Sequence, residues 1–563
     1  MYQTHQVHLV KRSIILEENK IIKNILSTYD KIQILCEEDG IVFFKLKDKE
    51  YGIWHSKEER NTSKPFILVK NDGEYDYPHI FSFEIPIDKD KQKYRLVCLH
   101  EPRDTINYLM SYEEKIIDTI ERLIHLLSLS PLEIEEEFQK EFLYYWNEQS
   151  KNDIPLRLYI ASDRVFQSMN VYQNKYKMYR AVSNGIKLND KDKWSYVNNI
   201  CAFYIPVTDN RRILPPVKDK PWKIDDILKI VKGMDVARIS HATYESIKKV
   251  KVKSNKAFII FEMMVLNHGI NFCCLIYFKN SKTETLMYKL ENSIKKIEPI
   301  KTKRCDYLFL NKQIANDISI VDKKVAIVGV GSLGSYLATE LVKSGIKKLI
   351  LYDSDTLEEA NIMRHRAKLS WSNISKVLAM KFDLESMHPE ISVNAKNEYL
   401  TQETLKRDMH DFDMIIFTVG SSDVQLMANN VFKEANNDKP VIYSWLEAGG
   451  TNSHILKVDY LKKGCFECLY TNKEGDLANN KANKLSDELV KQNTIRNGCG
   501  ATRVAYGTEI LLRTTCVILD TVKKTFSCEF EDNCLIDINP TSIINQGNTF
   551  KEGKCRCCGD RDS

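Results

Sequence analysis

A short stretch, VAIVGVGSLG, places the strongest constraint on how this chain of 563 residues folds. Its apolar start, residues 325–329, predicts a buried strand. Gly329, Gly331 and Gly334 have the G-x-G-x-x-G spacing. The next segment, SYLATELVKSG, predicts a helix, and the apolar run KKLILYD predicts a second strand that ends at Asp353. A strand, a glycine turn, a helix and a strand in this order predict the nucleotide-binding unit of a doubly wound α/β sheet.

Each glycine of this turn has a physical role. Gly329 permits the tight turn, Gly331 lets the backbone approach a phosphate, and Gly334 lets the helix pack on the strand. The N-terminus of the helix offers free N–H groups and the positive end of its dipole to the phosphates. Asp353 can accept a hydrogen bond from a ribose hydroxyl. An NAD-dependent dehydrogenase has the same glycines and the same acidic residue, so this motif alone leaves that alternative open.

The residues after the second strand favour a different nucleotide chemistry. Within YDSDTLEEANIMRHRAKLSWSNISKVLAM, the pair Asp353 and Asp355 is followed by Asn361, Arg364 and Lys376. This order resembles the D-x-D, N-x-x-R and lysine pattern of the ThiF/MoeB and ubiquitin-activating-enzyme superfamily. The resemblance implies that a carboxylate attacks the α-phosphate of ATP and expels pyrophosphate. Such a transfer depends on positioning and charge neutralisation, which a basic pair supplies. The alternative is a solvated, charged helix.

Composition excludes several other classes of protein. The hydrophobic content of 43% supports sizeable cores, and the length predicts about three or four domains. A net charge of +5 on so long a chain does not indicate nucleic-acid or membrane binding. We find neither a signal peptide nor an apolar run long enough to span a bilayer, so we expect a cytoplasmic protein. The 15 cysteines are then best interpreted as reduced thiols, metal ligands or catalytic thiols.

The N-terminal region, residues 1–150, predicts a helix, an antiparallel meander of apolar-rich strands, and then an amphipathic helix at SYEEKIIDTIERLIHLLSL. Cys98 follows the meander, and Pro78-His79 lies upstream of it. This order resembles a ubiquitin-conjugating enzyme of α+β fold, which implies that Cys98 is a catalytic thiol. The family has His-Pro where this chain has Pro-His, and we find no partner asparagine. The alternative is that Cys98 is a buried strand cysteine.

The middle region, residues 151–310, mixes predicted strands with a helix at IDDILKIVKGM and carries no glycine loop or acid–base cluster. We expect a mixed α/β linker domain that positions its neighbours. Cys273 and Cys274 lie in an apolar strand and are predicted to be core.

The C-terminal region, residues 311–563, contains two CxxC pairs far apart in the chain. Two such pairs predict a four-thiolate Zn²⁺ site, because a tetrahedral zinc takes four soft ligands and each pair presents two. The resemblance to the MoeB group implies a structural zinc. A redox-active CxxC is the alternative to a zinc site. Cys557 is a second candidate for the ligand position of Cys555, but the two-residue spacing favours Cys555. The predicted zinc ligands are Cys465, Cys468, Cys555 and Cys558.

Three further residues of this region have predicted roles. In the ThiF/MoeB pattern an aspartate just after the strand that matches residues 414–419 helps to hold Mg²⁺. This chain has Gly420-Ser421 at the matching place, and Asp423, a few residues later, is the candidate substitute. Cys499 lies in Asn-Gly-Cys-Gly before a helical stretch, where flanking glycines and a helix N-terminus favour a reactive thiolate. The superfamily implies that this cysteine accepts the activated carboxyl as a thioester. Cys516, inside the helix LLRTTCVIL, is predicted to be core.

The whole order resembles the fused ubiquitin-activating and ubiquitin-conjugating-like proteins of bacterial CBASS anti-phage systems. The resemblance implies a C-terminal Rossmann-like adenylating domain that uses MgATP, a thioester on Cys499 and transfer to Cys98. It also implies a partner with a free C-terminal carboxylate, such as a cGAS-like cyclic-oligonucleotide synthase, an unknown target amine and a homodimer. Two rivals stay open, a sulfur-carrier adenylyltransferase of ThiF/MoeB type and an NAD-binding regulatory protein.

Overall fold

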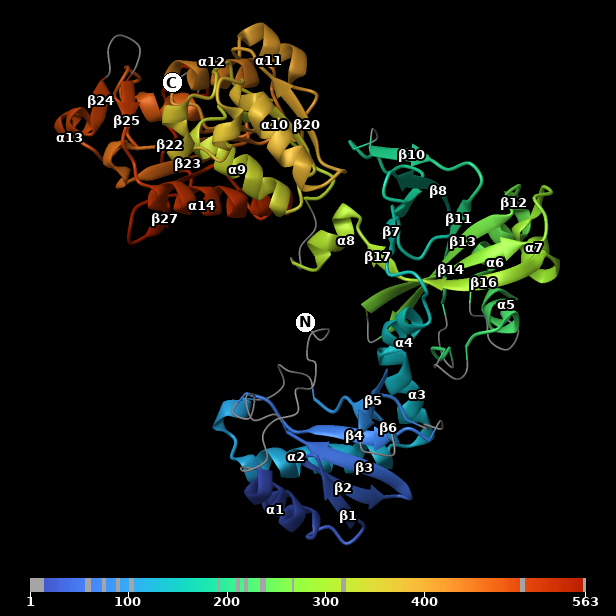
Figure 1. Ribbon diagram of the computed structural model, residues 1–563. Coiled ribbons are helices and arrows are strands. Elements are labelled where there is room, and N and C mark those ends of the chain that lie inside the picture. Colours follow the sequence, from blue (N-terminus) through green and yellow to red (C-terminus); the bar gives the residue numbers. More distant parts are fainter. Residues whose placement is uncertain are drawn as a thin grey trace. The chain divides into compact units, whose positions relative to one another are not determined.

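The computed structural model describes residues 15–55, 62–72, 77–87, 92–100, 106–190, 193–208, 213–216, 221–232, 239–265, 268–314, 320–496 and 502–559 (Figure 1). The chain divides into two compact units. The first comprises Met1–Leu158, Ser162–Asn184 and Tyr196–Lys303, and the second Tyr159–Ala161, Gly185–Ser195 and Arg304–Ser563. The finer division after residues 150 and 310 stays a prediction. Within the described ranges, no helix combines the length and the apolar character that a membrane crossing requires.

The first unit begins with the expected antiparallel meander, which forms a six-stranded sheet in the order β1-β2-β3-β4-β6-β5. Helices α1 and α2 share one apolar core with this sheet. Ser111 starts α2 with a capping box, because its hydroxyl accepts from Glu114 N at 3.2 Å and the Glu114 carboxylate accepts from Ser111 N at 2.7 Å. The elements are α1 (Ile15–Leu26), β1 (Gln33–Glu38), β2 (Ile41–Leu46), β3 (Lys49–Trp54), β4 (Phe66–Lys70), β5 (Ile80–Ile87), β6 (Gln92–Val97), η1 (Asn107–Leu109) and α2 (Tyr112–Ser128).

A second sheet of nine strands, most of whose residues belong to the first unit, runs β16-β14-β13-β11-β8-β9-β7-β17 with β10 paired to β8. Cys273 and Cys274 lie fully buried in β14, which confirms that both are core residues. The nine strands are β7 (Leu156–Tyr159), β8 (Gln167–Asn174), β9 (Tyr179–Ser183), β10 (Trp194–Tyr196), β11 (Cys201–Pro206), β13 (Lys256–Val265), β14 (His268–Phe278), β16 (Ile294–Ile300) and β17 (Thr302–Arg304). A separate two-stranded sheet pairs β12 (Lys251–Val252) with β15 (Glu284–Thr285). The helices are α3 (Pro131–Lys140), α4 (Phe142–Glu148), α5 (Ile224–Lys232), α6 (His241–Lys249) and α7 (Leu286–Asn292).

The second unit is built on an eight-stranded sheet in the order β20-β19-β18-β21-β22-β23-β26-β27. The first five strands are parallel and the last three antiparallel, and the order reverses direction at β18. Ligands bind at such a reversal point, outside the carboxyl ends of the strands. The eight strands are β18 (Lys324–Val328), β19 (Lys348–Tyr352), β20 (Ser392–Lys396), β21 (Met414–Phe417), β22 (Val441–Leu446), β23 (Ser453–Val458), β26 (Cys534–Ile538) and β27 (Ile543–Asn545). A separate two-stranded sheet pairs β24 (Thr494–Arg496) with β25 (Thr502–Val504).

Helices cover both faces of this sheet, as a doubly wound fold requires. Val325 and Ile327 of β18 point into one core, which α9, α10 and α14 complete, and α9 and α14 lie side by side in Figure 1. Ala326 and Val328 point into the opposite core, against α11, α12 and η6. The helices are α8 (Tyr307–Lys312), α9 (Ser332–Lys343), η3 (Glu359–Arg364), η4 (Leu369–Trp371), α10 (Lys376–Met387), α11 (Gln402–Asp408), α12 (Ser422–Glu434), η5 (Ala448–Gly450), η6 (Phe466–Tyr470), α13 (Asp487–Gln492) and α14 (Thr508–Phe526).

Candidate functional site

The glycine turn joins β18 to α9 at the reversal point of the sheet. Gly329 has a φ of +88°, and a Cβ built there would lie 2.8 Å from the backbone N of Val419. A Cβ on Gly334 would lie 1.9 Å from the carbonyl oxygen of Gly329. The first glycine therefore permits the turn, and the last permits the close approach of α9 to β18.

Gly331 differs from both, because a Cβ built there would meet nothing within 4 Å. It is the N-cap of the 12-residue helix α9 and makes no side-chain cap hydrogen bond. The helix therefore begins beside open space with its first N–H groups and the positive end of its dipole. This geometry fits a phosphate group.

Asp353 follows β19 and holds the glycine turn in place. Its Oδ2 accepts from Val330 N at 2.7 Å and its Oδ1 accepts from Asp355 N at 2.8 Å. Burial raises the pKa of the Asp353 carboxyl above its ordinary value, and the charge of Lys376 and the two backbone donors offset part of that rise. A carboxylate oxygen can accept more than one hydrogen bond, so the predicted bond from a ribose hydroxyl to Asp353 is still possible.

A basic pair follows the turn. Lys376 is the first residue of α10, and its Nζ lies 2.6 Å from Asp355 Oδ2. Arg364 ends η3 and is partly exposed, and no hydrogen bond or ion pair joins its side chain to any residue in the described part of the chain. Asn361 of η3 is buried, and its Oδ1 accepts from Glu358 N at 3.0 Å. Arg364 is thus a cation without a carboxylate partner among these residues.

His365 connects this segment to the glycine turn, and the sequence analysis missed it. Its Nε2 donates to the carbonyl oxygen of Val330 at 2.8 Å, and its Nδ1 accepts from Ala367 N at 3.0 Å. Burial lowers the pKa of His365 below its ordinary value, and the charges of Lys376 and Arg364 lower it further. Both cations therefore act on a neutral ring that touches the turn. The only signal in the sequence was its position next to Arg364.

Asp423 lies in the first turn of α12, the helix that follows β21 after a short loop, and its side chain is exposed. Because β21 and β18 are parallel neighbours, Asp423 and the glycine turn lie at the same edge of the sheet. Among the described residues, no hydrogen bond or ion pair joins its carboxylate to that turn, and its predicted role with Mg²⁺ stays a prediction.

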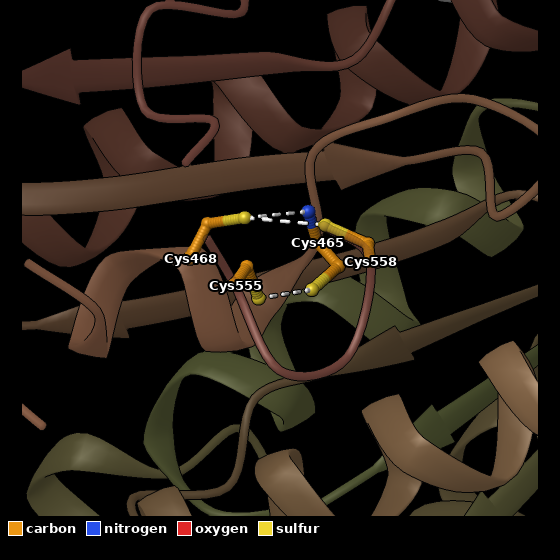
Figure 2. A group of neighbouring side chains, drawn as sticks. All are labelled: Cys465, Cys468, Cys555 and Cys558. Carbon is orange, nitrogen blue, oxygen red and sulfur yellow. Dashed lines mark hydrogen bonds between the residues drawn. The ribbon is translucent and has the colours of Figure 1, made fainter. Parts of the chain in front are cut away.

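The structure brings the two distant CxxC pairs together (Figure 2). All four sulfur atoms are buried and lie within 4.8 Å of one another. Cys465 Sγ lies 3.8 Å from Cys555 Sγ, and Cys468 Sγ lies 3.4 Å from Cys558 Sγ. A tetrahedral Zn²⁺ with Zn–S bonds of about 2.3 Å sets its sulfur atoms about 3.8 Å apart. The donor set and its dimensions therefore fit Zn²⁺.

Cys557 lies outside this set of four and has another contact. Asn429 of α12 is fully buried, and its Nδ2 donates to Cys557 Sγ at 3.1 Å. Its Oδ1 accepts from Phe466 N at 2.9 Å and from the Tyr460 hydroxyl at 3.0 Å. Asn429 therefore holds both halves of the thiol cluster against α12.

Cys98 lies directly after the end of β6 and is partly exposed, so it is not a buried residue within the strand. Its N–H donates to the carbonyl oxygen of His79 at 2.7 Å, which places Pro78-His79 beside it. The His79 ring contacts Glu141 at 2.6 Å through Nδ1 and Glu137 at 3.2 Å through Nε2. Burial opposes protonation of this ring, but the two carboxylates outweigh burial and raise the pKa of His79.

Two further cysteines, Cys499 and Cys516, were given roles from the sequence. Cys499 lies outside the described residues. The prediction that Cys516 is core is wrong, since it is exposed on α14. The buried face of this helix includes Thr514, Thr515 and Val517, which leaves Cys516 on the side that faces solvent.

Residues 314–527 match the family model described as ThiF family. A curated relative from Pseudomonas aeruginosa, "ATP-dependent ubiquitin transferase-like protein Cap2", is 26% identical over 304 residues, which are 52% of each chain. "Ubiquitin-like modifier-activating enzyme 5" of Caenorhabditis elegans is 29% identical over 165 residues, or 27% of this chain and 38% of that protein. The chain thus matches about half or less of the length of these relatives.

Among solved structures, Escherichia coli MccB with succinimide is 20% identical and has a TM-score of 0.34. That similarity covers 43% of this chain and 68% of the other.

Proposed function

We propose that this chain, whose residues 314–527 match the ThiF family, uses MgATP to activate the C-terminal carboxylate of a partner protein and conjugates it to an amine. A carboxylate oxygen of the partner attacks the α-phosphorus of ATP, and the bond to the bridging oxygen breaks so that pyrophosphate leaves. Gly331 and the N-terminus of α9 face the phosphates, while Arg364 and Lys376 neutralise the charge that develops on them. Asp353 takes a ribose hydroxyl, and Asp423 is the candidate for holding Mg²⁺.

Two thiols continue the reaction in this proposal. The thiolate of Cys499 attacks the carbonyl of the acyl adenylate, and AMP leaves. The thiolate of Cys98 then takes the acyl group and releases Cys499. An amine of the target attacks the second thioester, which forms the amide and frees Cys98. Each thioester keeps the carboxyl activated between steps. By its resemblance to CBASS proteins, the partner is a cGAS-like nucleotidyltransferase, the setting is anti-phage defence in the cytoplasm, and the enzyme is a homodimer.

The main observation in support of this proposal is the state of the Arg364 side chain. Its guanidinium has no carboxylate partner in the described region. The charges of Arg364 and Lys376 both lower the pKa of His365, so the two cations lie near one ring. Such a pair of cations suits a bound triphosphate. A dinucleotide such as NAD does not need this pair. The name of the Pseudomonas relative, an ATP-dependent ubiquitin transferase-like protein, supports the same reading.

We expect Arg364→Ala to weaken binding of MgATP by about 10- to 100-fold, the loss that follows when a charged hydrogen bond is removed. Isothermal titration calorimetry with MgATP and with NAD measures both affinities. Arg366→Ala is the matched control, because its exposed side chain lies over the Tyr336 ring, and it should keep wild-type affinity. Tight binding of NAD, or an unchanged affinity of Arg364→Ala for MgATP, would support the regulatory rival instead.

A further inference from the structure

The nine-stranded sheet surrounds a cavity that the proposed reaction does not use. The two ends of this sheet meet, because β17 pairs with β7 and follows β16 after Lys301, whose carbonyl oxygen accepts from Leu156 N at 2.8 Å. The cavity has a volume of about 230 Å³, and all its lining residues belong to the first unit. An apolar cavity of ~150 Å³ already holds benzene, so this one has room for an aromatic ring with a short chain.

Alternate residues of two central strands line this cavity. In β13 they are Lys256 and Phe258, and in β14 they are Leu275 and Tyr277. They form two directly opposite pairs, because Lys256 is paired with Tyr277 and Phe258 with Leu275. Successive side chains of a strand point to opposite faces, and Ala257 accordingly lies in the core that the helices complete on the other face. The cavity therefore lies on the face of the sheet that these helices do not cover.

The walls of the cavity are mostly apolar. Phe258 is buried, and the Tyr179 ring of β9 meets it edge-on, with 5.7 Å between the ring centroids. Walls of this kind favour a ligand with an apolar or aromatic body. Further apolar lining comes from Pro155, Leu156, Ile200, Leu275 and Ile300.

Three lining residues carry hydrogen-bond donors that have no acceptor. No hydrogen bond or ion pair joins the ammonium groups of Lys177 and Lys256, or the hydroxyl of Tyr179, to another residue of the described part of the chain. Lys256 Nζ lies 5.1 Å from the centre of the Tyr277 ring, so it stays on the cavity side of the sheet. These donors call for a ligand that supplies an acceptor.

The carboxylate that lines the cavity already has two partners. Glu298 Oε2 accepts from the Tyr277 hydroxyl at 2.9 Å, and Glu298 Oε1 forms an ion pair with Lys296, which is not a lining residue. Lys296 therefore balances the charge of Glu298. The positive charges of Lys177 and Lys256 remain unbalanced among the described lining residues, which favours an anion.

We propose that this cavity is a binding site for a small carboxylate with an apolar or aromatic body. The carboxylate accepts charge-assisted hydrogen bonds from Lys177 and Lys256 and a further one from the Tyr179 hydroxyl. The body lies against Phe258 and Leu275. Inorganic phosphate has no surface to cover these apolar walls, and an alkylammonium would meet two charges of its own sign. The site is independent of the proposed function, because it shares no residue with the glycine turn.

This ligand chemistry has two sources, a free acid or the C-terminal residue of a protein chain. Hydrocinnamate is the probe for the first source, and a short peptide that ends in phenylalanine with a free carboxylate is the probe for the second. Hydrocinnamyl alcohol and the amidated peptide keep the aromatic body and lack the carboxylate. We expect a carboxylate probe to bind the full-length protein in isothermal titration calorimetry, and its uncharged counterpart to bind about 10-fold more weakly or not at all.

Lys256→Met should weaken binding of the carboxylate probe by about 10-fold or more, because it removes a charged hydrogen bond and keeps the length of the side chain. Lys177→Met, in the turn between β8 and β9, is the second variant should Lys256→Met fail to fold. Lys253→Met is the matched control, since this exposed lysine is close in sequence to Lys256 and does not line the cavity. It should keep the wild-type affinity.

The outcomes separate the two sources and the alternatives. Binding of the free-carboxylate peptide without binding of hydrocinnamate would support the site with a protein C-terminus as its ligand, and the reverse would support a free acid. Failure of both carboxylates to bind would overturn the inference. Equal affinity for the uncharged counterpart, or wild-type affinity in both Lys256→Met and Lys177→Met, would overturn it as well.

Discussion

Gly334→Ala is expected to destabilise the second unit by about 3 kcal/mol or more, at the upper end of what overpacking costs, and to abolish binding of MgATP. A Cβ at this position would lie 1.9 Å from the carbonyl oxygen of Gly329 and 2.7 Å from Thr418 Oγ1. The first contact is with backbone and cannot be relieved by a rotamer. Either α9 moves away from β18 or the glycine turn opens, and both changes displace the phosphate site.

Gly331→Ala is the comparison that separates folding from binding. Its Cβ would meet no atom within 4 Å, so the free energy of unfolding should stay within about 0.5 kcal/mol of the wild type. The methyl group would occupy the space that the phosphate needs, and MgATP affinity should fall. Urea unfolding and calorimetry measure the two quantities. Equal stability of Gly334→Ala and the wild type would contradict the packing described here.

Cys468→Ser is expected to remove the zinc and to unfold much of the second unit. In small zinc-binding peptides, the binding of zinc contributes an apparent folding free energy of roughly 10–16 kcal/mol. The free energy of unfolding of an ordinary domain is only about 5–15 kcal/mol, so the loss of zinc is comparable to the entire stability. The four thiols join η6 to the C-terminal segment, and both parts belong to the core of one sheet face. A chelator should reproduce the effect in the wild type.

Cys557→Ser supplies the control for this prediction. Its thiol lies outside the set of four, so the protein should keep one zinc per chain by mass spectrometry and unfold close to the wild-type temperature. A metal-free wild type with a disulfide between Cys465 and Cys468 would contradict the zinc site and favour the redox alternative. Loss of zinc from Cys557→Ser would instead show that the ligand set differs.

The parts of the fold that the sequence predicted depend on local patterns. The β18–α9–β19 unit was predictable because apolar periodicity and glycine spacing lie within one short stretch. The thiol cluster was predictable from two CxxC pairs because few other arrangements satisfy four soft ligands. The prediction for Cys516 failed because residue type alone does not define the buried face of α14, where threonines are buried and the cysteine is exposed.

The connections between these parts were not predictable in the same way. His365 bonds to a carbonyl oxygen 35 residues away, Asn429 bonds to a thiol 128 residues away, and His454 bonds to a carboxylate 83 residues away. Each partner comes close only when the sheet order is known, and no spacing rule links them. Cys98 is a similar case, because its neighbour His79 is identified by strand pairing and a backbone hydrogen bond.

The most direct measurement traps the acyl group on the two thiols. The protein is co-expressed with its chromosomal neighbours as wild type, Cys98→Ser and Cys499→Ser, and adducts are compared on reducing and non-reducing gels and by intact mass. We expect an ATP-dependent adduct of one neighbour that is sensitive to reduction, accumulates on Cys499 in Cys98→Ser, and is absent from Cys98 in Cys499→Ser. An adenylated carrier whose adducts never involve Cys98 would contradict the relay and favour the sulfur-carrier alternative.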